Sequence, residues 1–171
     1  MPSLIIIAGP NGAGKTTLAN EYLSAEERRF EFVNADEIAR DLNVGACLDV
    51  RAARLMLERI DELVEAGADF VIETTLASLT YAQKTPVWQQ RGYRVSLVYL
   101  RLASAEESID RVRKRVAAGG HGIPEEAIRR RFPKSADYFE NIYKPIVDEW
   151  YIWRSAEGTF TPINAWDGRF A

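Results

Sequence analysis

A glycine-rich segment near the N-terminus has the residue types and the spacing needed to bind phosphate. Gly9, Gly14, Lys15 and Thr16 fit the pattern G-x-x-x-x-G-K-[ST]. In this pattern, backbone N–H groups surround phosphate oxygens, the lysine reaches the β- and γ-phosphates, and the threonine hydroxyl ligates Mg²⁺. We therefore predict a phosphate site for ATP, with Mg²⁺ at Thr16. Its residues are Gly9, Pro10, Asn11, Gly12, Ala13, Gly14, Lys15, Thr16 and Thr17.

Two acidic residues follow segments that are predicted to be strands. Asp36 comes just after the β-prone segment 30–33, and Glu73 follows the apolar run 70–72. The carboxyl ends of parallel strands line the ligand crevice of an open α/β sheet, so both residues should lie near the phosphate loop. Asp36 could accept a proton from a substrate hydroxyl or help to hold Mg²⁺, or it could instead cap the following helix. Glu73, together with Thr75, is expected on the substrate side, with a merely exposed strand terminus as the alternative.

A third group of candidates lies in a basic segment, residues 111–131, which contains seven arginine and lysine residues and two glutamates, although the whole chain carries a net charge of -3. A glycine-rich break at 119–124 separates two helical patterns here. A helix, a hinge and a second helix predict a lid over approximately 113–131 that would close over nucleotide and exclude water. Its candidate residues are Arg115, Arg130, Arg131 and His121.

Two residues of the lid region have alternative interpretations. Ser104 and Glu107 form a capping-box pattern that begins the first lid helix, and Arg111 follows Glu107 by four residues. We expect Arg111 to form an ion pair with Glu107 on the helix surface rather than to contact phosphate. For His121, contact with substrate or phosphate competes with simple packing of the loop.

The hydrophobic pattern predicts the elements that position these residues. Continuous apolar runs at 4–7, 70–72 and 95–100 are typical of parallel strands that are covered on both faces. Helical patterns are predicted at 15–23, 50–66 and 80–91, the last one disturbed at Pro86, and closing strands at 150–153 and 159–163. The fold class expected is therefore α/β, with a mostly parallel sheet between layers of helices.

The segment 132–148 is harder to interpret. Pro133 and Pro145 make a single straight helix across it improbable. Tyr138, Ile142 and Ile146 nevertheless recur at helical spacing, and we expect them to belong to the core.

Length and composition limit the class of protein. The 171 residues, with 47% hydrophobic composition, suit one domain spanning residues 1–171. No apolar run reaches the length of about 20 residues that a membrane span needs, and the N-terminus does not resemble a signal peptide, so a cytoplasmic location is expected. Cys47, the single cysteine, excludes an intrachain disulfide.

Five motifs occur in one order: GPNGAGKTT, FVNADEIARDL, FVIETTL, GYRVSLVYLRL and RVRKRVAAGGHGIPEEAIRRRF. Together they resemble the zeta-toxin family of P-loop kinases, in its subgroup of small stand-alone ATPases, over about residues 3–148. The resemblance implies an adenylate-kinase-like α/β sandwich with a helical lid, and phosphorylation that depends on Mg²⁺ and ATP. Family members phosphorylate UDP-N-acetylglucosamine and are held inactive by an antitoxin.

By that resemblance, Lys15 and Thr16 match the phosphate and Mg²⁺ residues, and Asp36 matches the general base. Glu73 and Thr75 match groups on the substrate side. Arg115 and one of Arg130 or Arg131 match the paired arginines of the transition state. The expected function is a small-molecule kinase, with neither membrane nor nucleic acid as partner. The alternative is a nucleotide-dependent switch that acts on a protein partner.

Overall fold

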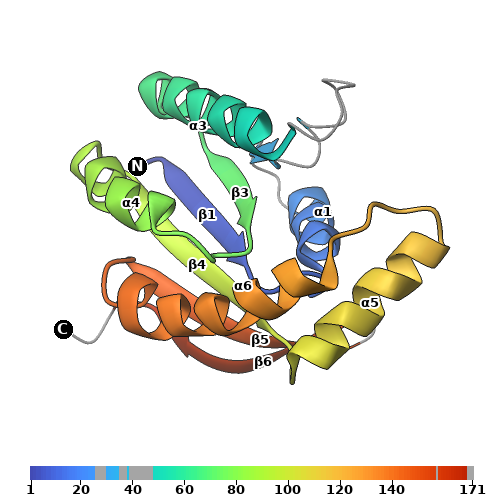
Figure 1. The fold of residues 1–171 in the computed structure, drawn as a ribbon. Coiled ribbons are helices and arrows are strands. Elements are labelled where there is room, and N and C mark those ends of the chain that lie inside the picture. Colours follow the sequence, from blue (N-terminus) through green and yellow to red (C-terminus); the bar gives the residue numbers. More distant parts are fainter. Residues whose placement is uncertain (26–29, 35–37, 39–47, 157, 169–171) are drawn as a thin grey trace.

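The central element is a six-stranded sheet, seen in a computed structural model that describes residues 1–25, 30–34, 38, 48–156 and 158–168 (Figure 1). The strand order is β2-β3-β1-β4-β5-β6, in which only β6 is antiparallel to its neighbour. The strands are β1 (Ser3–Ala8), β2 (Glu31–Val33), β3 (Phe70–Thr74), β4 (Arg94–Arg101), β5 (Glu149–Ala156) and β6 (Thr159–Trp166). The predicted α/β class, with a mostly parallel sheet, is confirmed.

Helices cover both faces of the sheet (Figure 1). They are α1 (Lys15–Ala25), α3 (Leu48–Ala66), α4 (Thr80–Gln90), α5 (Ala105–Ala117) and α6 (Glu125–Tyr138), which continues into the π-helical turn η1 (Phe139–Tyr143). None of the helices in the described ranges combines the length and the apolar character needed to cross a membrane.

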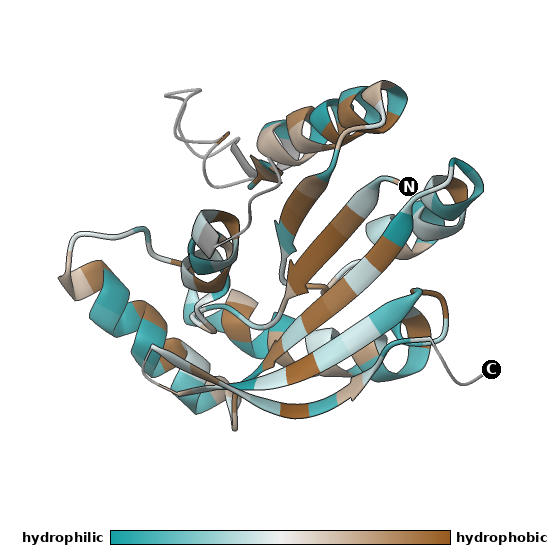
Figure 2. Cartoon of the chain, turned by 180° about the vertical axis from the view of Figure 1, so that it is seen from behind, coloured by the Kyte–Doolittle hydropathy of each residue, from teal (hydrophilic) through white to brown (hydrophobic). Residues whose placement is uncertain are grey.

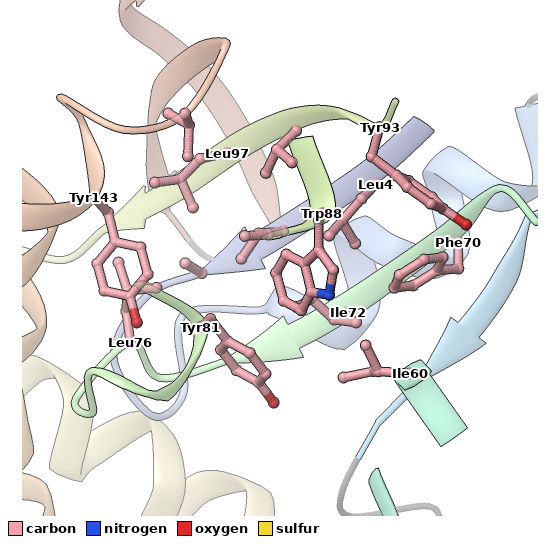
Figure 3. Close-up of a cluster of buried hydrophobic side chains, with 14 of the residues drawn as sticks. Leu4, Ile60, Phe70, Ile72, Leu76, Tyr81, Trp88, Tyr93, Leu97 and Tyr143 are labelled. Atoms are coloured by element: carbon pink, nitrogen blue, oxygen red, sulfur yellow. The ribbon is translucent and has the colours of Figure 1, made fainter. Parts of the chain in front are cut away.

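The apolar residues of β1 alternate between two cores, because successive side chains of a strand point to opposite faces. Leu4 and Ile6 pack with α3, α4 and η1, whereas Ile5 and Ile7 pack with Leu18 of α1. Figure 2 shows the central strands largely in hydrophobic colours and the outer helix surfaces largely hydrophilic. The first core is the larger, and in Figure 3 Trp88 of α4 lies among its aliphatic and aromatic side chains. The phosphate loop therefore starts from a strand that is buried on both sides.

Two prolines lie inside helices, and the segment 132–148 is not a single straight helix, as expected. Pro86 lies inside α4, and Pro133 lies inside α6. A proline removes one N–H donor and leaves one carbonyl of the preceding turn without its usual partner. In α4, that carbonyl belongs to Ala82, and the buried Thr85 hydroxyl donates to the neighbouring Tyr81 carbonyl oxygen at 2.7 Å. Both helices are also held by tertiary packing, which overrides local propensity.

In the segment after Pro133, the fully buried residues lie one position along the chain from the ones expected in the core. Tyr138, Ile142 and Ile146 are only partly buried, whereas Phe139 and Tyr143 are fully buried. The buried residues Ser135, Phe139, Tyr143 and Val147 recur every four residues, one position along from the expected set. Within η1, the Lys144 N–H donates to the Phe139 carbonyl oxygen at 3.0 Å, five residues back. The Tyr143 hydroxyl accepts from the Ala82 N–H at 3.2 Å and donates to the Ser78 carbonyl oxygen at 2.7 Å. These bonds fix the end of α6–η1 against the start of α4.

Candidate active site

The phosphate loop connects β1 to α1 through residues 9–14. Gly9, Gly12 and Gly14 have φ angles of +147°, +75° and +83°, a region that side chains rarely adopt. A Cβ on Gly9 would lie 2.5 Å from the Leu100 carbonyl oxygen of β4. A backbone atom cannot move aside as a flexible side chain can. The first glycine of the motif is therefore required by close backbone packing as well as by its torsion angle.

We predict that replacing Gly9 by alanine lowers stability more than replacing Gly92, which also has a positive φ but has open space around it. Gly92→Ala should cost about 1 kcal/mol from the torsion angle alone. Gly9→Ala should cost about 3 kcal/mol, because strain and overlap add. The thermal unfolding midpoints of the two variants measure the difference, and equal midpoints would contradict the packing role.

The outer side of the loop is held by elements distant in sequence. On α5, the Ser108 hydroxyl donates to the Asn11 carbonyl oxygen, and a Cβ on Gly12 would lie 2.9 Å from Arg111 Cβ. On β6, the Phe160 ring lies 3.3 Å from the position of a Cβ on Gly14. The loop is thus supported by the first lid helix and by the last strand, in addition to β1 and α1.

Arg111 links these two supports. Its guanidinium donates to the Ser155 hydroxyl and to the Ser155 carbonyl oxygen, both at 2.9 Å, and lies 2.6 Å from a Glu107 carboxylate oxygen. The predicted pair with Glu107 is confirmed. The helix cap is also confirmed, since the Glu107 N–H donates to the Ser104 hydroxyl at 3.1 Å. Arg111 therefore joins α5 to β5. It does not line the cavity described below, whereas Arg115 does.

Glu73, at the end of β3, connects the loop to the strand edge. Its Oε2 atom accepts from the Thr16 hydroxyl at 2.7 Å and from the Asn34 side-chain amide at 2.9 Å. Its Oε1 atom lies 3.8 Å from Lys15 Nζ, which also donates to the Pro10 carbonyl oxygen at 3.1 Å. The carboxylate thus contacts phosphate-loop residues, and Glu73 also lines the cavity described below, so its expected place on the substrate side stays a prediction.

This placement affects which residues could hold Mg²⁺. The hydroxyl of Thr16 and the carboxylate of Glu73 present oxygen atoms 2.7 Å apart, and Mg²⁺ prefers oxygen ligands, often one or two carboxylates plus water and substrate phosphate. The residues present therefore fit a magnesium site on the phosphate side. Asn34, which the sequence did not single out as a site residue, belongs to the same group because it follows β2 directly and donates to Glu73.

We predict that Glu73→Gln weakens the effect of Mg²⁺ on nucleotide binding by about tenfold, because glutamine keeps the size of the side chain and removes its charge. The affinity for a fluorescent ATP analogue, measured against Mg²⁺ concentration, tests this. Affinity without Mg²⁺ should stay close to wild type. Glu62→Gln, on the exposed surface of α3, is the matched control. An unchanged Mg²⁺ dependence in Glu73→Gln would exclude this role.

The turn after β3 directs the next residues toward the ligand side. Leu76 has a φ of +59° and is fully buried, and its N–H donates to the Thr74 hydroxyl at 3.0 Å. A leucine in this conformation costs about 1–2 kcal/mol, which its buried side chain offsets. The chain thereby turns sharply, and Thr75 and Ser78 both line the cavity beside the loop.

That cavity has a volume of about 750 Å³ and brings together nine of the candidate residues. They are Asn11, Gly12, Lys15, Glu73, Thr75, Arg115, His121, Arg130 and Arg131. Asp36 lies outside the described residues, as does Cys47. The cavity also contains residues that the sequence did not single out, namely Ala52, Ala53 and Met56 of α3, Ser78, Tyr81 of α4 and Lys134 of α6. The apolar members of this set form an apolar wall, and α6 lines the cavity with charged residues.

Tyr81 is the buried polar group of the apolar wall. Its hydroxyl contacts the Met56 sulfur at 3.4 Å, a weak acceptor. Burial, followed by the nearby Tyr143, raises the pKa of Tyr81 to about 12. The side chain is therefore neutral near pH 7 and offers a hydrogen-bonding hydroxyl to a ligand.

The two helices of the predicted lid are attached to each other. Arg113 pairs with Glu125, and Arg129 pairs with Glu106 at 2.5 Å. Between these ion pairs, Ile109, Val112 and Ile128 form a small apolar core. Arg115 donates to the His121 carbonyl oxygen at 2.7 Å, which fixes the connecting loop. We expect α5 and α6 to move as one body if the lid closes.

Comparison with known proteins gives both a family and a fold. The model of a family described as AAA domain matches residues 4–141. An uncharacterized protein of Haemophilus influenzae is 27% identical over 130 residues, which are 75% of this chain and 91% of that protein.

Three solved structures are similar in fold. The structure of the PezAT toxin–antitoxin system of Streptococcus pneumoniae has a TM-score of 0.65 and 17% identity, covering 96% of this chain and 72% of that one. A gluconokinase from Sinorhizobium meliloti has a TM-score of 0.60 and 17% identity, covering 91% and 84%. A chain of the Pnkp1/Rnl/Hen1 RNA repair complex has a TM-score of 0.68 and 22% identity, covering 95% of this chain but 48% of its own. The fold is that of P-loop kinases.

Proposed function

This chain belongs to the AAA domain family, and from that membership and the cavity beside the loop we propose that it is a kinase that transfers the γ-phosphoryl group of ATP to a hydroxyl of a small molecule. One observation carries the proposal. The phosphate-loop lysine, the Glu73 carboxylate, which accepts from the Thr16 hydroxyl, and the lid arginines line one cavity of about 750 Å³. A cavity that extends from the phosphate loop to α3, α4 and α6 supports an acceptor site beside the nucleotide.

In the proposed reaction, the acceptor hydroxyl attacks the γ-phosphorus, and the bond from that phosphorus to the β-phosphate oxygen breaks to release ADP. Asp36 takes the hydroxyl proton. Lys15, Arg115 and one of Arg130 or Arg131 offset negative charge on the transferring oxygens. Mg²⁺, held through Thr16 with Glu73 nearby, supplies further charge neutralisation when it is bound. Thr75 and His121 contact the acceptor.

Several finer assignments belong to the same proposal. The motif resemblance supports membership of the zeta-toxin group, with UDP-N-acetylglucosamine as acceptor and an antitoxin as partner. The likeness to the PezAT structure supports that group through the fold alone. We further propose that residues 1–171 act as one kinase domain in the cytoplasm, with a lid over approximately 113–131.

The test uses labelled ATP, Mg²⁺ and a metabolite extract that contains nucleotide sugars. Mass analysis of the labelled products should identify one phosphorylated small molecule. If labelled free phosphate were the sole product under all conditions, the kinase proposal would fail and the nucleotide-dependent switch would be favoured. Heat-inactivated protein is the control for background hydrolysis.

A further inference from the structure

The face of α6 that lines the cavity carries an unusual charge pattern. Ala127, Arg130, Arg131 and Lys134 recur three and four residues apart, so they share one face of the helix, and all four line the cavity. The rotation of the helix is fixed by the neighbouring buried residue Ser135, whose hydroxyl lies 3.0 Å from the Tyr99 hydroxyl in the core. The three cations therefore face the cavity because packing holds them there.

These cations differ from the other arginines of the lid helices. Arg111, Arg113 and Arg129 each pair with a glutamate. Within the described part of the chain, by contrast, no hydrogen bond or ion pair involves Arg130, Arg131 or Lys134. Arg111, Arg113 and Arg129, which do not line the cavity, are thus paired with glutamates. Arg130, Arg131 and Lys134, which line it, are not.

The acidic content of the cavity does not balance this charge. Among its described lining residues, Glu73 is the one carboxylate, and it already accepts hydrogen bonds from Thr16 and Asn34. Arg115 and Lys15 add two more positive charges to the lining. A cavity with this excess favours ligands that bring several negative charges.

The position of Lys134 separates it from the groups that serve ATP. Lys134 lies one helical turn beyond Arg130, roughly 6 Å along the axis. In Figure 1, α6 runs from the side of α1 toward the side of α4, so this turn leads away from the phosphate loop. Ser78 and Tyr81, at the start of α4, line the same cavity. In this arrangement, the triphosphate is bound by the loop N–H groups, Lys15 and the lid arginines nearer the loop, and Lys134 is not needed for it.

We propose that Lys134 binds an oxyanion of the acceptor, a carboxylate or a phosphate group separate from the hydroxyl that reacts. The inference rests on the proposed kinase function and adds a substrate class to it: the acceptor is a small anionic molecule. Its neutral part lies against Met56 and the Tyr81 hydroxyl on the apolar wall. Lys134 is thus a specificity residue rather than a catalytic one.

A small acceptor fits the surroundings better than a nucleic acid does. The cavity volume of about 750 Å³ lies within the range of small-molecule sites. Binding of a long nucleic acid calls for a broad basic surface, whereas this chain has a net charge of -3.

Binding measurements can test the proposal while the donor site is filled. The full chain, saturated with Mg²⁺ and a non-hydrolysable ATP analogue, is titrated calorimetrically with glucose 6-phosphate, gluconate and UDP-N-acetylglucosamine. Glucose and N-acetylglucosamine are the neutral counterparts. We expect at least one anionic compound to bind better than its counterpart, and Lys134→Gln to weaken that binding tenfold or more. The phosphate and carboxylate compounds distinguish the two kinds of oxyanion.

Lys84→Gln is the matched control, because Lys84 pairs with Asp61 at the surface and the change in net charge is the same. It should leave every affinity unchanged. The proposal is overturned if no anionic compound binds better than its neutral counterpart, if Lys134→Gln binds it as tightly as wild type, or if a 5′-hydroxyl oligonucleotide alone binds through Lys134.

The outcomes also separate this inference from the kinase proposal. Transfer of phosphate to neutral sugars alone would keep the kinase function and refute the role of Lys134. Binding of an anion through Lys134 without transfer of phosphate to any hydroxyl would do the reverse. Affinity for the ATP analogue should be equal in wild type and Lys134→Gln, which confirms that the variant is folded.

Discussion

Lys15→Met is expected to reduce phosphoryl transfer at least about 10²-fold and to weaken ATP binding, while the melting temperature without nucleotide stays close to wild type. The ammonium group of Lys15 is the charge that the loop presents to the β- and γ-phosphates. Methionine keeps most of the buried side-chain volume, and Glu73 keeps its bonds to Thr16 and Asn34. Transfer from labelled ATP and calorimetric nucleotide titrations measure the two effects.

The control is Lys84→Met, which removes a lysine from a surface ion pair with Asp61 and should leave transfer unchanged. A large loss of stability in nucleotide-free Lys15→Met would assign Lys15 a structural role through its contacts with Pro10 and Glu73. Normal transfer by this variant would contradict the assignment of the loop as the donor site.

Asp36→Asn is expected to lower transfer by about 10²-fold or more while ATP affinity stays unchanged, because asparagine cannot take the proton of the acceptor hydroxyl. This substitution also separates the two interpretations of Asp36. Asparagine caps helices about as well as aspartate, so a cap would survive the change whereas a base would not. The rate is measured with the acceptor identified from the metabolite extract.

A matched control is Asp61→Asn on the exposed side of α3, which should leave the rate within a factor of two. Wild-type transfer by Asp36→Asn would show that another group accepts the proton. Because asparagine also caps helices, the melting temperature of Asp36→Asn does not test the cap. Asp36→Ala does: if Asp36 caps the helix, this variant should lose about 1 kcal/mol of unfolding free energy.

The features that were predictable from the sequence are the ones that depend on local pattern. The phosphate loop lies where the motif places it, because glycines with positive φ and a buried preceding strand are encoded within a dozen residues. The buried strands were recognised from continuous apolar runs. A single cavity is lined by Lys15, Arg115 and Arg131. This was predictable because the carboxyl ends of the strands and the lid were expected at the same edge of the sheet.

Features that depend on tertiary packing were not predictable in the same way. Phe139, Tyr143 and Val147 have the same helical spacing as Tyr138, Ile142 and Ile146, so the sequence pattern does not decide which of the two neighbouring sets is fully buried. Lys134 went unnoticed because it follows Pro133, where the sequence suggested a break and the structure continues α6. The hydrogen bond from Thr16 to Glu73 was not predictable either, because it joins residues that are 57 positions apart in the chain.

The contact of Phe160 with the loop at Gly14 has a consequence for the order in which the protein becomes competent. During synthesis, the loop leaves the ribosome before two of its supports, Phe160 of β6 and Ser155 of β5, the second of which is joined to it through Arg111 of α5. A nascent chain that ends before β5 has the complete phosphate motif and lacks both supports. Tight nucleotide binding should therefore appear only after β5 and β6 have been made.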